Sequence, residues 1–201
     1  NRSVSSISGA SDVLAALGVK LDVGPAVIER CIAEAGVGFM WAPMHHPAMK
    51  HWAAIRGELG IRTIFNLLGP ISNPAGVKRQ VVGVFNAAWT EPIAEALKNL
   101  GSVHAWVVHG SDGMDEITLA GETMIGELKD GEVTEYTIHP REFGLETRDS
   151  DVLKVWDATQ AKDMLLAVLD GMPGPARDIV LFNAGAAIYV ADRAATLGEG
   201  I

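Results

Sequence analysis

Two adjacent carboxylates, Asp115 and Glu116, lie in a glycine-containing stretch directly after the apolar run VHAWVVHG. In open α/β sheets the ligand crevice lies beyond the carboxyl ends of the strands, and a loop in this position borders it. Carboxylates are hard oxygen ligands, and Mg²⁺ favours one or two of them together with substrate phosphate and water. Asp115 and Glu116 are therefore candidate metal ligands. A solvated acidic turn is the alternative, and the local pattern alone favours it.

The run NRSVSSISG, residues 1–9, is rich in hydroxyl side chains. Serine hydroxyls and consecutive backbone N–H groups can cradle phosphate oxygens, especially just before a helix begins. Arg2 would add a charged fork that suits the same oxygens. A serine-rich capping loop is the alternative, and the spacing alone favours that interpretation.

Other polar residues in the first third of the chain have several interpretations. Arg56 follows Met49 by seven positions on the same face of an expected helix. It could point into a crevice or equally extend into solvent. His45, His46 and His51 lack metal-ligand spacing with a third partner, which favours helix-start or packing roles for them.

Charge and composition limit the function classes. The 201 residues contain 16 Lys and Arg against 25 Asp and Glu, a net charge of −9, which disfavours nucleic acid as a partner and a basic helix on a membrane surface. One cysteine excludes a disulfide framework and a multi-cysteine zinc site. No apolar run approaches the roughly 20 residues of a membrane span. We therefore expect a cytoplasmic enzyme domain, with residues 1–201 forming a single α/β domain.

The first half of the chain predicts mostly helices. Periodic apolar residues and glycine or proline boundaries indicate helices at 11–17, 25–36 and 45–60. The short apolar run 37–43 predicts a buried strand, and residues 62–76 predict an apolar stretch followed by a turn-rich loop. Asn66 in this segment could order a turn or contact a ligand, and the turn is favoured.

The second half alternates strands with helices. Strands are expected at 80–86 and 103–110 around a helix at 91–101. Residues 122–140 read as a β-hairpin with Asp130 and Gly131 at its turn. Two helical patterns follow, at 159–171 and 175–200. This order predicts an α/β fold with a mainly parallel central sheet, flanking helices and a β-hairpin insertion.

Three motifs combine into a specific resemblance. NRSVSSISGASDVLAALGV, FMWAPMHHPAMKHWAAIRGELGIRTIFNLLGPISNPAG and VVHGSDGMDEIT occur in this order. Together they resemble the anthranilate phosphoribosyltransferases of tryptophan biosynthesis, over nearly the whole chain. The resemblance implies transfer of the phosphoribosyl group of phosphoribosyl pyrophosphate to anthranilate, with release of pyrophosphate, and implies the Mg²⁺ cofactor and a homodimer of the intact protein.

The resemblance also implies roles for particular residues. Metal ligands would be Asp115 and Glu116. Phosphoribosyl pyrophosphate would be bound by Asn1, Arg2, Ser3, Val4, Ser5, Ser6 and Ala10. Anthranilate would be met by Asn1, Arg56, His46 and Met49. No side chain is expected to form a covalent intermediate, so no catalytic nucleophile is assigned.

The chain departs from the family pattern at its start. The glycine-rich diphosphate loop, the segment that supplies a second metal contact and most of the N-terminal helical domain are missing from residues 1–201. We therefore expect the chain to be a fragment of a longer protein, and the implied activity belongs to the intact protein. A pyrimidine nucleoside phosphorylase is one alternative, disfavoured by GMDEIT. A non-catalytic paralogue that binds nucleotide or nucleic acid is another, disfavoured by the charge of −9 and the acidic pair.

Overall fold

In a computed structural model of the chain, the described residues are 9–46, 52, 58 and 63–201. The chain divides into two compact units, each taken here by itself. The first consists of Asn1–Arg62 and Val155–Asp170, and the second of Thr63–Lys154 and Gly171–Ile201.

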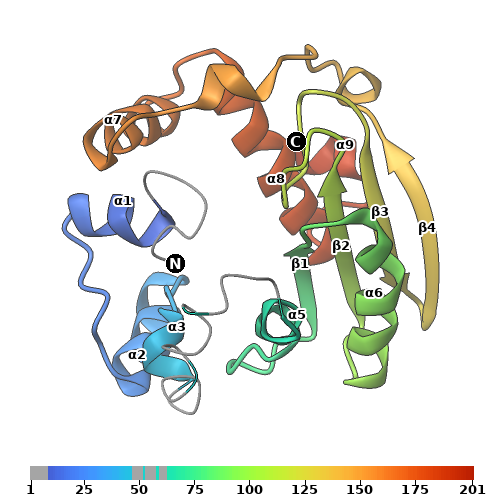
Figure 1. Cartoon of the computed structure of the whole chain (residues 1–201), viewed down its shortest axis with the longest axis horizontal. Helices are drawn as coiled ribbons and strands as arrows, with labels where there is room; N and C mark the ends of the chain where they lie inside the picture. Colours follow the sequence, from blue (N-terminus) through green and yellow to red (C-terminus); the bar gives the residue numbers. More distant parts are fainter. Residues whose placement is uncertain (1–8, 47–51, 53–57, 59–62) are drawn as a thin grey trace. The chain divides into compact units, whose positions relative to one another are not determined.

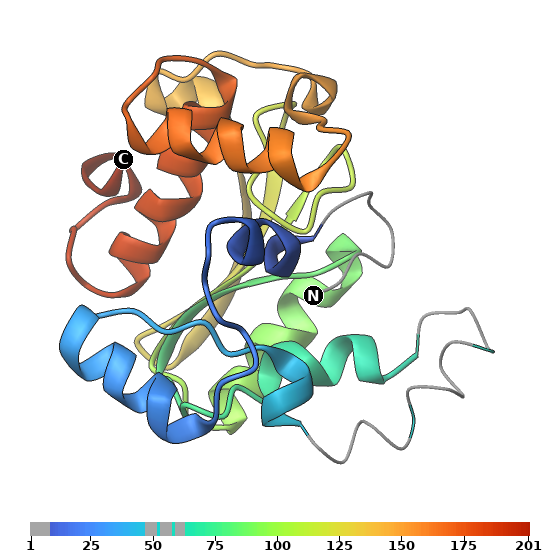
Figure 2. The ribbon, with the colours of Figure 1, turned by 90° about the vertical axis from the view of Figure 1, so that its left-hand side faces the viewer.

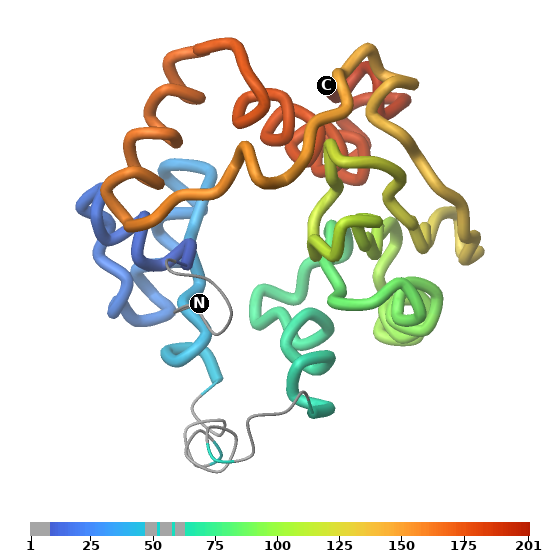
Figure 3. The backbone as a smooth tube through the Cα atoms, turned by 45° about the horizontal axis from the view of Figure 1, so that its top comes forward, coloured from blue at the N-terminus to red at the C-terminus, as the bar shows by residue number. Residues whose placement is uncertain are grey.

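The first unit is helical in its described part. Its helices are α1 (Ala10–Ala16), α2 (Pro25–Ala35), α3 (Ala42–His45) and α7 (Ala158–Leu169). Although α1 and α7 are far apart in the sequence, they pack side by side (Figures 2 and 3). Proline opens α2, and Gly36 ends it in the left-handed conformation with φ of 77°, as the sequence predicts for a helix with these boundaries.

The prediction of a strand at 37–43 is wrong. Residues 37–41 form no regular element, and α3 begins directly after them. Val37 is 71% exposed, so this apolar run is not the interior of a sheet. Proline in the first turn of α3 suits the start of a helix, and it has no backbone N–H to donate to a neighbouring strand. The helix expected at 45–60 lies mostly outside the described residues.

The second unit contains a mixed sheet (Figure 1). Its strands are β1 (Arg79–Gly83), β2 (His104–Gly110), β3 (Thr123–Lys129) and β4 (Glu132–Ile138), in the order β1-β2-β3-β4. The pair β1–β2 is parallel, and the pairs β2–β3 and β3–β4 are antiparallel. The predicted α/β class is confirmed, but only the first described pair is parallel, because no crossover helix joins β2 to β3 or β3 to β4.

The predicted hairpin is confirmed. Asp130 and Gly131 connect β3 to β4 with positive φ values of 52° and 81°. Two successive positive φ values form the tight turn whose twist matches that of paired antiparallel strands. The turn therefore fixes the register of β3 on β4.

Helices cover both faces of the sheet (Figure 1). On β2, Trp106 and Val108 face the cluster built with α8 (Pro175–Val190), whereas Ala105 and Val107 face the cluster that includes α6 (Thr90–Asn99). Successive strand residues point to opposite faces, so an unbroken apolar run suits a strand covered on both sides. Within the described ranges, no helix is long and apolar enough to cross a membrane.

Shorter elements complete this unit. They are α5 (Phe65–Ile71), α9 (Leu197–Gly200) and the 3₁₀ segments η2 (Ala87–Trp89), η3 (Pro140–Phe143) and η4 (Ser150–Leu153). The expected apolar stretch and the start of the turn-rich loop after it fold as α5, whose buried Leu67 joins the cluster that includes α6. Asn66 accepts a hydrogen bond from the Thr63 N–H at 2.9 Å, which agrees with its expected role in ordering a turn. The long helical pattern at 175–200 breaks at Asp192, whose φ is 54°.

Candidate metal and substrate site

The acidic pair lies at the edge of the sheet where the parallel strands end. β2 ends at Gly110, and the chain returns to the sheet at Thr123, where β3 begins. A Cβ built on Gly83, the last residue of β1, would lie 2.1 Å from the carbonyl oxygen of Asp115. The structure therefore places Asp115 against the carboxyl end of β1, at the edge where α/β sheets bind ligands.

Hydrogen bonds close the loop into a compact turn before the acidic pair. The Gly110 N–H donates to the Met114 carbonyl at 2.8 Å, and the Gly113 N–H donates to the Gly110 carbonyl at 2.9 Å. Asp112 accepts from the Met114 N–H at 3.3 Å and from the Thr118 hydroxyl at 2.9 Å. Asp112 therefore joins the two ends of the segment that carries the acidic pair, and its carboxylate is already hydrogen-bonded.

A second anchor lies directly behind the pair. Asn183, on α8, accepts a hydrogen bond from the Ile117 N–H at 3.0 Å and donates to the Ile117 carbonyl at 2.9 Å. The next residue, Thr118, is buried, and its N–H donates to the Thr123 hydroxyl at 3.1 Å. The backbone after Glu116 is thus held to both α8 and β3.

The charges of this loop suit a bound cation. Asp115 and Glu116 are exposed, and among the described residues neither forms a salt bridge with a basic side chain. Although Glu116 is exposed as a whole residue, surrounding atoms partly bury its carboxyl and raise its pKa, and the negative charges of Asp115 and Asp112 raise the pKa further. A divalent cation would remove this like-charge repulsion.

The number of carboxylates also fits Mg²⁺. The part of the chain that the structure describes holds no group of three or more His, Cys, Asp or Glu side chains arranged for a metal ion. Mg²⁺ commonly takes only one or two protein carboxylates and completes its shell with substrate phosphates and water. A pair is therefore the donor set expected where the metal binds together with a diphosphate substrate.

His109 was not among the residues singled out from the sequence. Its Nδ1 lies 2.7 Å from the carbonyl oxygen of Val84, so Nδ1 carries the proton of this hydrogen bond. The imidazole thereby joins the end of β2 to the residue that follows β1. This contact supports the edge on which the acidic loop rests.

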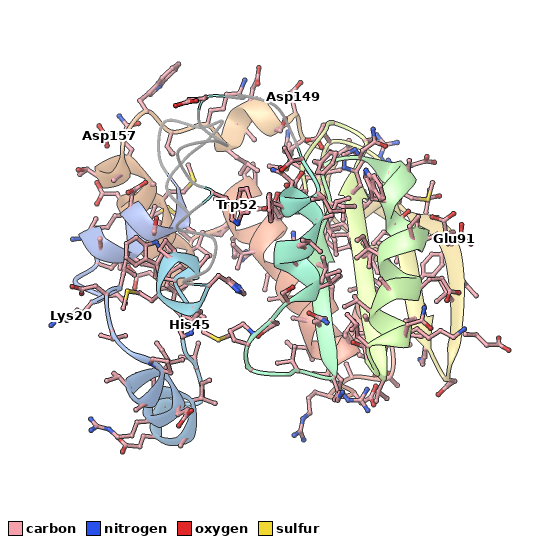
Figure 4. The ribbon with its side chains drawn as sticks, turned by 60° about the horizontal axis from the view of Figure 1, so that its bottom comes forward. Lys20, His45, Trp52, Glu91, Asp149 and Asp157 are labelled. Carbon is pink, nitrogen blue, oxygen red and sulfur yellow. The ribbon has the colours of Figure 1, made fainter. Side chains whose placement is uncertain are left out.

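The remaining site residues expected from the sequence belong to the first unit. Ala10 is the exposed first residue of α1, and the N–H of the preceding Gly9 donates to Asp12 at 2.9 Å. His46 is half-buried and directly follows α3, on which His45 lies (Figure 4). The expected residues that lie outside the described ones are Asn1, Arg2, Ser3, Val4, Ser5, Ser6, Met49 and Arg56.

Three residues that shape the loop were missed by sequence reasoning. The sequence pattern placed Gly83 only within an apolar strand, although a glycine inside a strand can mark a close approach of another backbone. Asn183 lies inside α8, where asparagine is intrinsically unfavourable, and this was a detectable sign of a specific hydrogen-bonding role. Asp112 precedes Gly113 in the loop after β2, and an aspartate before a glycine in a loop is typical of a turn held by a side-chain hydrogen bond.

Comparisons with curated proteins extend over the whole chain. Anthranilate phosphoribosyltransferase of Thiobacillus denitrificans is 68% identical over 200 residues, which cover 100% of this chain and 58% of that protein. The enzyme of the same name from Rhodopseudomonas palustris (strain TIE-1) is 59% identical over 201 residues, covering 100% of this chain and 60% of that protein. The chain thus spans 58–60% of the length of these relatives.

Solved structures give the same result. The chain matches the crystal structure of anthranilate phosphoribosyltransferase from Thermus thermophilus with a TM-score of 0.92 and 43% identity, over 100% of this chain and 59% of that one. It matches the Saccharomyces cerevisiae enzyme in complex with PRPP and Mg with a TM-score of 0.87 and 26% identity, over 99% and 56% of the two chains. Residues 1–201 also match the family described as "Glycosyl transferase family, a/b domain". This chain therefore belongs to that glycosyl transferase family and matches its a/b domain over its whole length.

Proposed function

We propose that the protein containing this chain transfers the phosphoribosyl group of phosphoribosyl pyrophosphate to the amino nitrogen of anthranilate, releasing pyrophosphate. It would thus act as an anthranilate phosphoribosyltransferase in tryptophan biosynthesis. The observation that carries the proposal is the acidic pair Asp115 and Glu116, held at the carboxyl edge of the parallel strands. The relative with 68% identity supports the same activity.

In this proposal Asp115 and Glu116 hold Mg²⁺. Bound there, the ion would offset the negative charge that develops on the departing pyrophosphate. The two carboxylates would supply protein oxygens, and phosphate oxygens of the substrate would complete the shell. Their exposure leaves them accessible to a substrate.

Phosphoribosyl pyrophosphate would be held by the hydroxyl-rich start of the chain. The proposed residues are Asn1, Arg2, Ser3, Val4, Ser5, Ser6 and Ala10. Serine hydroxyls and backbone N–H groups donate hydrogen bonds to phosphate oxygens, and the Arg2 guanidinium adds positive charge. Since the Gly9 N–H already donates to Asp12, we expect the phosphate contacts to come from the other residues of this set and not from Gly9.

Anthranilate would be oriented by its carboxylate. Arg56 can form two parallel hydrogen bonds to a carboxylate, and Asn1 is assigned to the same group. His46 and Met49 would line the entry to this subsite. Holding the weakly nucleophilic amine near C1 of the ribose lowers the entropic part of the barrier, and no covalent enzyme intermediate is needed.

The proposal also covers the setting of the reaction. We propose that the intact protein is longer than this chain, forms a homodimer and acts in the cytoplasm. Its partners would be the two small-molecule substrates, with neither nucleic acid nor a membrane. These statements rest on the family resemblance and on the net charge of −9.

The test is an assay of the full-length protein for formation of N-(5-phosphoribosyl)anthranilate, with and without Mg²⁺. We expect turnover that depends on Mg²⁺, anthranilate and phosphoribosyl pyrophosphate. A folded full-length protein without turnover would remove the proposal. Phosphate-dependent cleavage of a pyrimidine nucleoside would favour a phosphorylase instead. A mobility shift of nucleic acid at physiological salt would favour a binding paralogue.

A further inference from the structure

The side-chain amide of Asn183 holds both polar backbone groups of Ile117, the residue that directly follows Glu116. Asn183 Oδ1 accepts from the Ile117 N–H at 3.0 Å, and Asn183 Nδ2 donates to the Ile117 carbonyl oxygen at 2.9 Å. Sliding or turning this backbone segment would break at least one of these bonds. The amide therefore fixes the position of the chain immediately after the acidic pair.

Asn183 is itself fixed in orientation. Its Nδ2 also donates to the Ile179 carbonyl at 3.0 Å, one turn earlier in α8. Two carbonyl oxygens at one end of the amide and an N–H at the other assign which end is nitrogen. Neighbouring residues Phe182 and Ala186 are fully buried in the core, so this part of α8 is packed against the sheet. The amide thus projects from a rigid support.

Burial of the Ile117 side chain cannot by itself fix the backbone in the way that the Asn183 amide does. The Ile117 side chain is 0% exposed and belongs to the same core cluster as Phe182. Hydrophobic burial is non-directional, so it holds Ile117 near α8 without setting the direction in which the preceding backbone leaves. The paired hydrogen bonds set that direction, because both depend on the angle of the peptide groups.

The other end of the acidic segment is restricted by β1. The Asp115 carbonyl oxygen lies 2.1 Å from the position of a Cβ built on Gly83, so the backbone of Asp115 packs closely against that of β1. A two-residue segment held at both ends presents its carboxylates in a narrow range of positions. Mg²⁺ demands near-ideal octahedral geometry, so small displacements of its ligands weaken its binding.

We propose that Asn183 is a positioning residue for Asp115 and Glu116, acting through the backbone of Ile117 to set their affinity for the metal. The inference rests on the proposed function only in taking these two carboxylates as the metal ligands. Asn183 touches neither substrate nor metal in this role. Its loss should therefore change metal affinity more than the rate reached at saturating metal.

The experiment uses the full-length enzyme and the variants Asn183→Ala and Asn183→Asp. The Asp variant keeps the acceptor for the Ile117 N–H but loses the donor to the two carbonyls. Binding of Mn²⁺, a paramagnetic substitute with similar oxygen ligands, is measured by electron paramagnetic resonance with phosphoribosyl pyrophosphate present. We expect the Mn²⁺ dissociation constant to rise about tenfold in both variants, as expected for the loss of one or two hydrogen bonds. The turnover number at saturating Mg²⁺ should change much less.

Tyr189→Phe is the matched control on the same helix. Tyr189 donates to Glu127 at 2.9 Å, away from the acidic loop. We expect its Mn²⁺ affinity to remain that of the unmodified enzyme. Equal weakening in this control, or unchanged Mn²⁺ affinity in a folded Asn183 variant, would overturn the inference.

A measurement on the unmodified enzyme covers the case in which the variants do not fold. The Ile117 amide should exchange its hydrogen slowly, as the Asn183 bond requires, and rapid exchange there would overturn the inference. Different results would contradict the proposed function and the positioning role. Lack of anthranilate turnover in the unmodified enzyme would remove the function, whereas selective loss of Mn²⁺ affinity in the variants would still support the positioning role.

Discussion

Gly83 and Asp115 lie so close together that no side chain fits between them. A Cβ on Gly83 would lie 2.1 Å from the Asp115 carbonyl oxygen and 2.9 Å from its carbonyl carbon. Glycine is required here by the space available, since its φ lies outside the left-handed region. The last residue of β1 thus determines how near the acidic loop comes to the sheet.

Gly83→Ala should displace Asp115. Inserting a methyl group this close to a carbonyl oxygen costs about 1–3 kcal/mol of stability if the chain moves to relieve the overlap. Because the moving residue carries a proposed metal ligand, we expect at least about tenfold weaker Mg²⁺ binding. Thermal unfolding and the Mg²⁺ dependence of turnover in the full-length enzyme measure the two effects.

Gly69→Ala is the matched control for that substitution. Gly69 lies in α5 of the same unit, and apart from its chain neighbours and the backbone of its own helix, a Cβ added to it would meet no atom within 4 Å. Alanine should leave the Mg²⁺ dependence of turnover unchanged, although Pro70 disfavours the helical conformation for a preceding residue that carries a Cβ. Equal loss of Mg²⁺ affinity in both variants would show that the contact between Gly83 and Asp115 has no special role.

Replacing both acids, Asp115→Asn with Glu116→Gln, should nearly abolish turnover. Neutral amides keep the size of the side chains but lose the charge that holds a divalent cation. A control double variant, Glu132→Gln with Asp130→Asn, removes two exposed carboxylates at the β3–β4 turn of the same unit. We expect it to retain near-normal kinetics. Full activity of the first double variant in a steady-state assay would contradict the metal role.

Local sequence signals predicted the elements whose boundaries are set by nearby residues. The hairpin is one example, since the Asp130-Gly131 dipeptide selects a turn with two positive φ values. Helix α2 is another, since a proline and a glycine mark its two ends. In both cases a few neighbouring residues determine the backbone geometry.

Gly131→Ala tests that local control. Gly131 has φ of 81° and open space around it, so alanine there meets backbone strain without a steric neighbour. We expect about 1–2 kcal/mol lower stability by urea unfolding, the cost of the left-handed conformation for a residue with a Cβ. Asp130→Asn should be nearly neutral, because asparagine tolerates this conformation. Unchanged stability of Gly131→Ala would mean that the turn readily adopts another form.

Local sequence patterns could not predict the contacts between residues that are distant in the sequence. The apolar run 37–43 satisfies the pattern of a buried strand, yet residues 37–41 form no regular element and α3 begins at Ala42. Asp115 and Glu116 could be identified by type and by their place after a strand. Their supports could not, because Gly83 and Asn183 are 32 and 68 positions from Asp115 along the chain (115 − 83 and 183 − 115).

A second cluster of polar side chains, centred on Glu127, is buried in the unit that contains the sheet and shares no residue with the acidic loop. Tyr136 and Tyr189 donate to its carboxylate at 2.7 and 2.9 Å, and His104 Nε2 lies 3.0 Å from it. Burial pushes the pKa of Glu127 upward, but these hydrogen bonds, led by that of Tyr136, hold the pKa below its ordinary value. The group joins β2, β3, β4 and α8 in the interior.

Glu127→Gln should lower stability most at neutral pH. A lowered folded-state pKa means that the carboxylate stabilises the fold above the ordinary value of 4.5 and loses this effect as pH falls through the lowered value. We expect a loss of about 1–3 kcal/mol near neutral pH, because an amide cannot accept every donor around it. Urea unfolding at neutral and acidic pH should show the difference from the unmodified protein shrinking with acid. Glu132→Gln, at an exposed strand end, is the neutral control, and a pH-independent loss in Glu127→Gln would contradict the assigned charge.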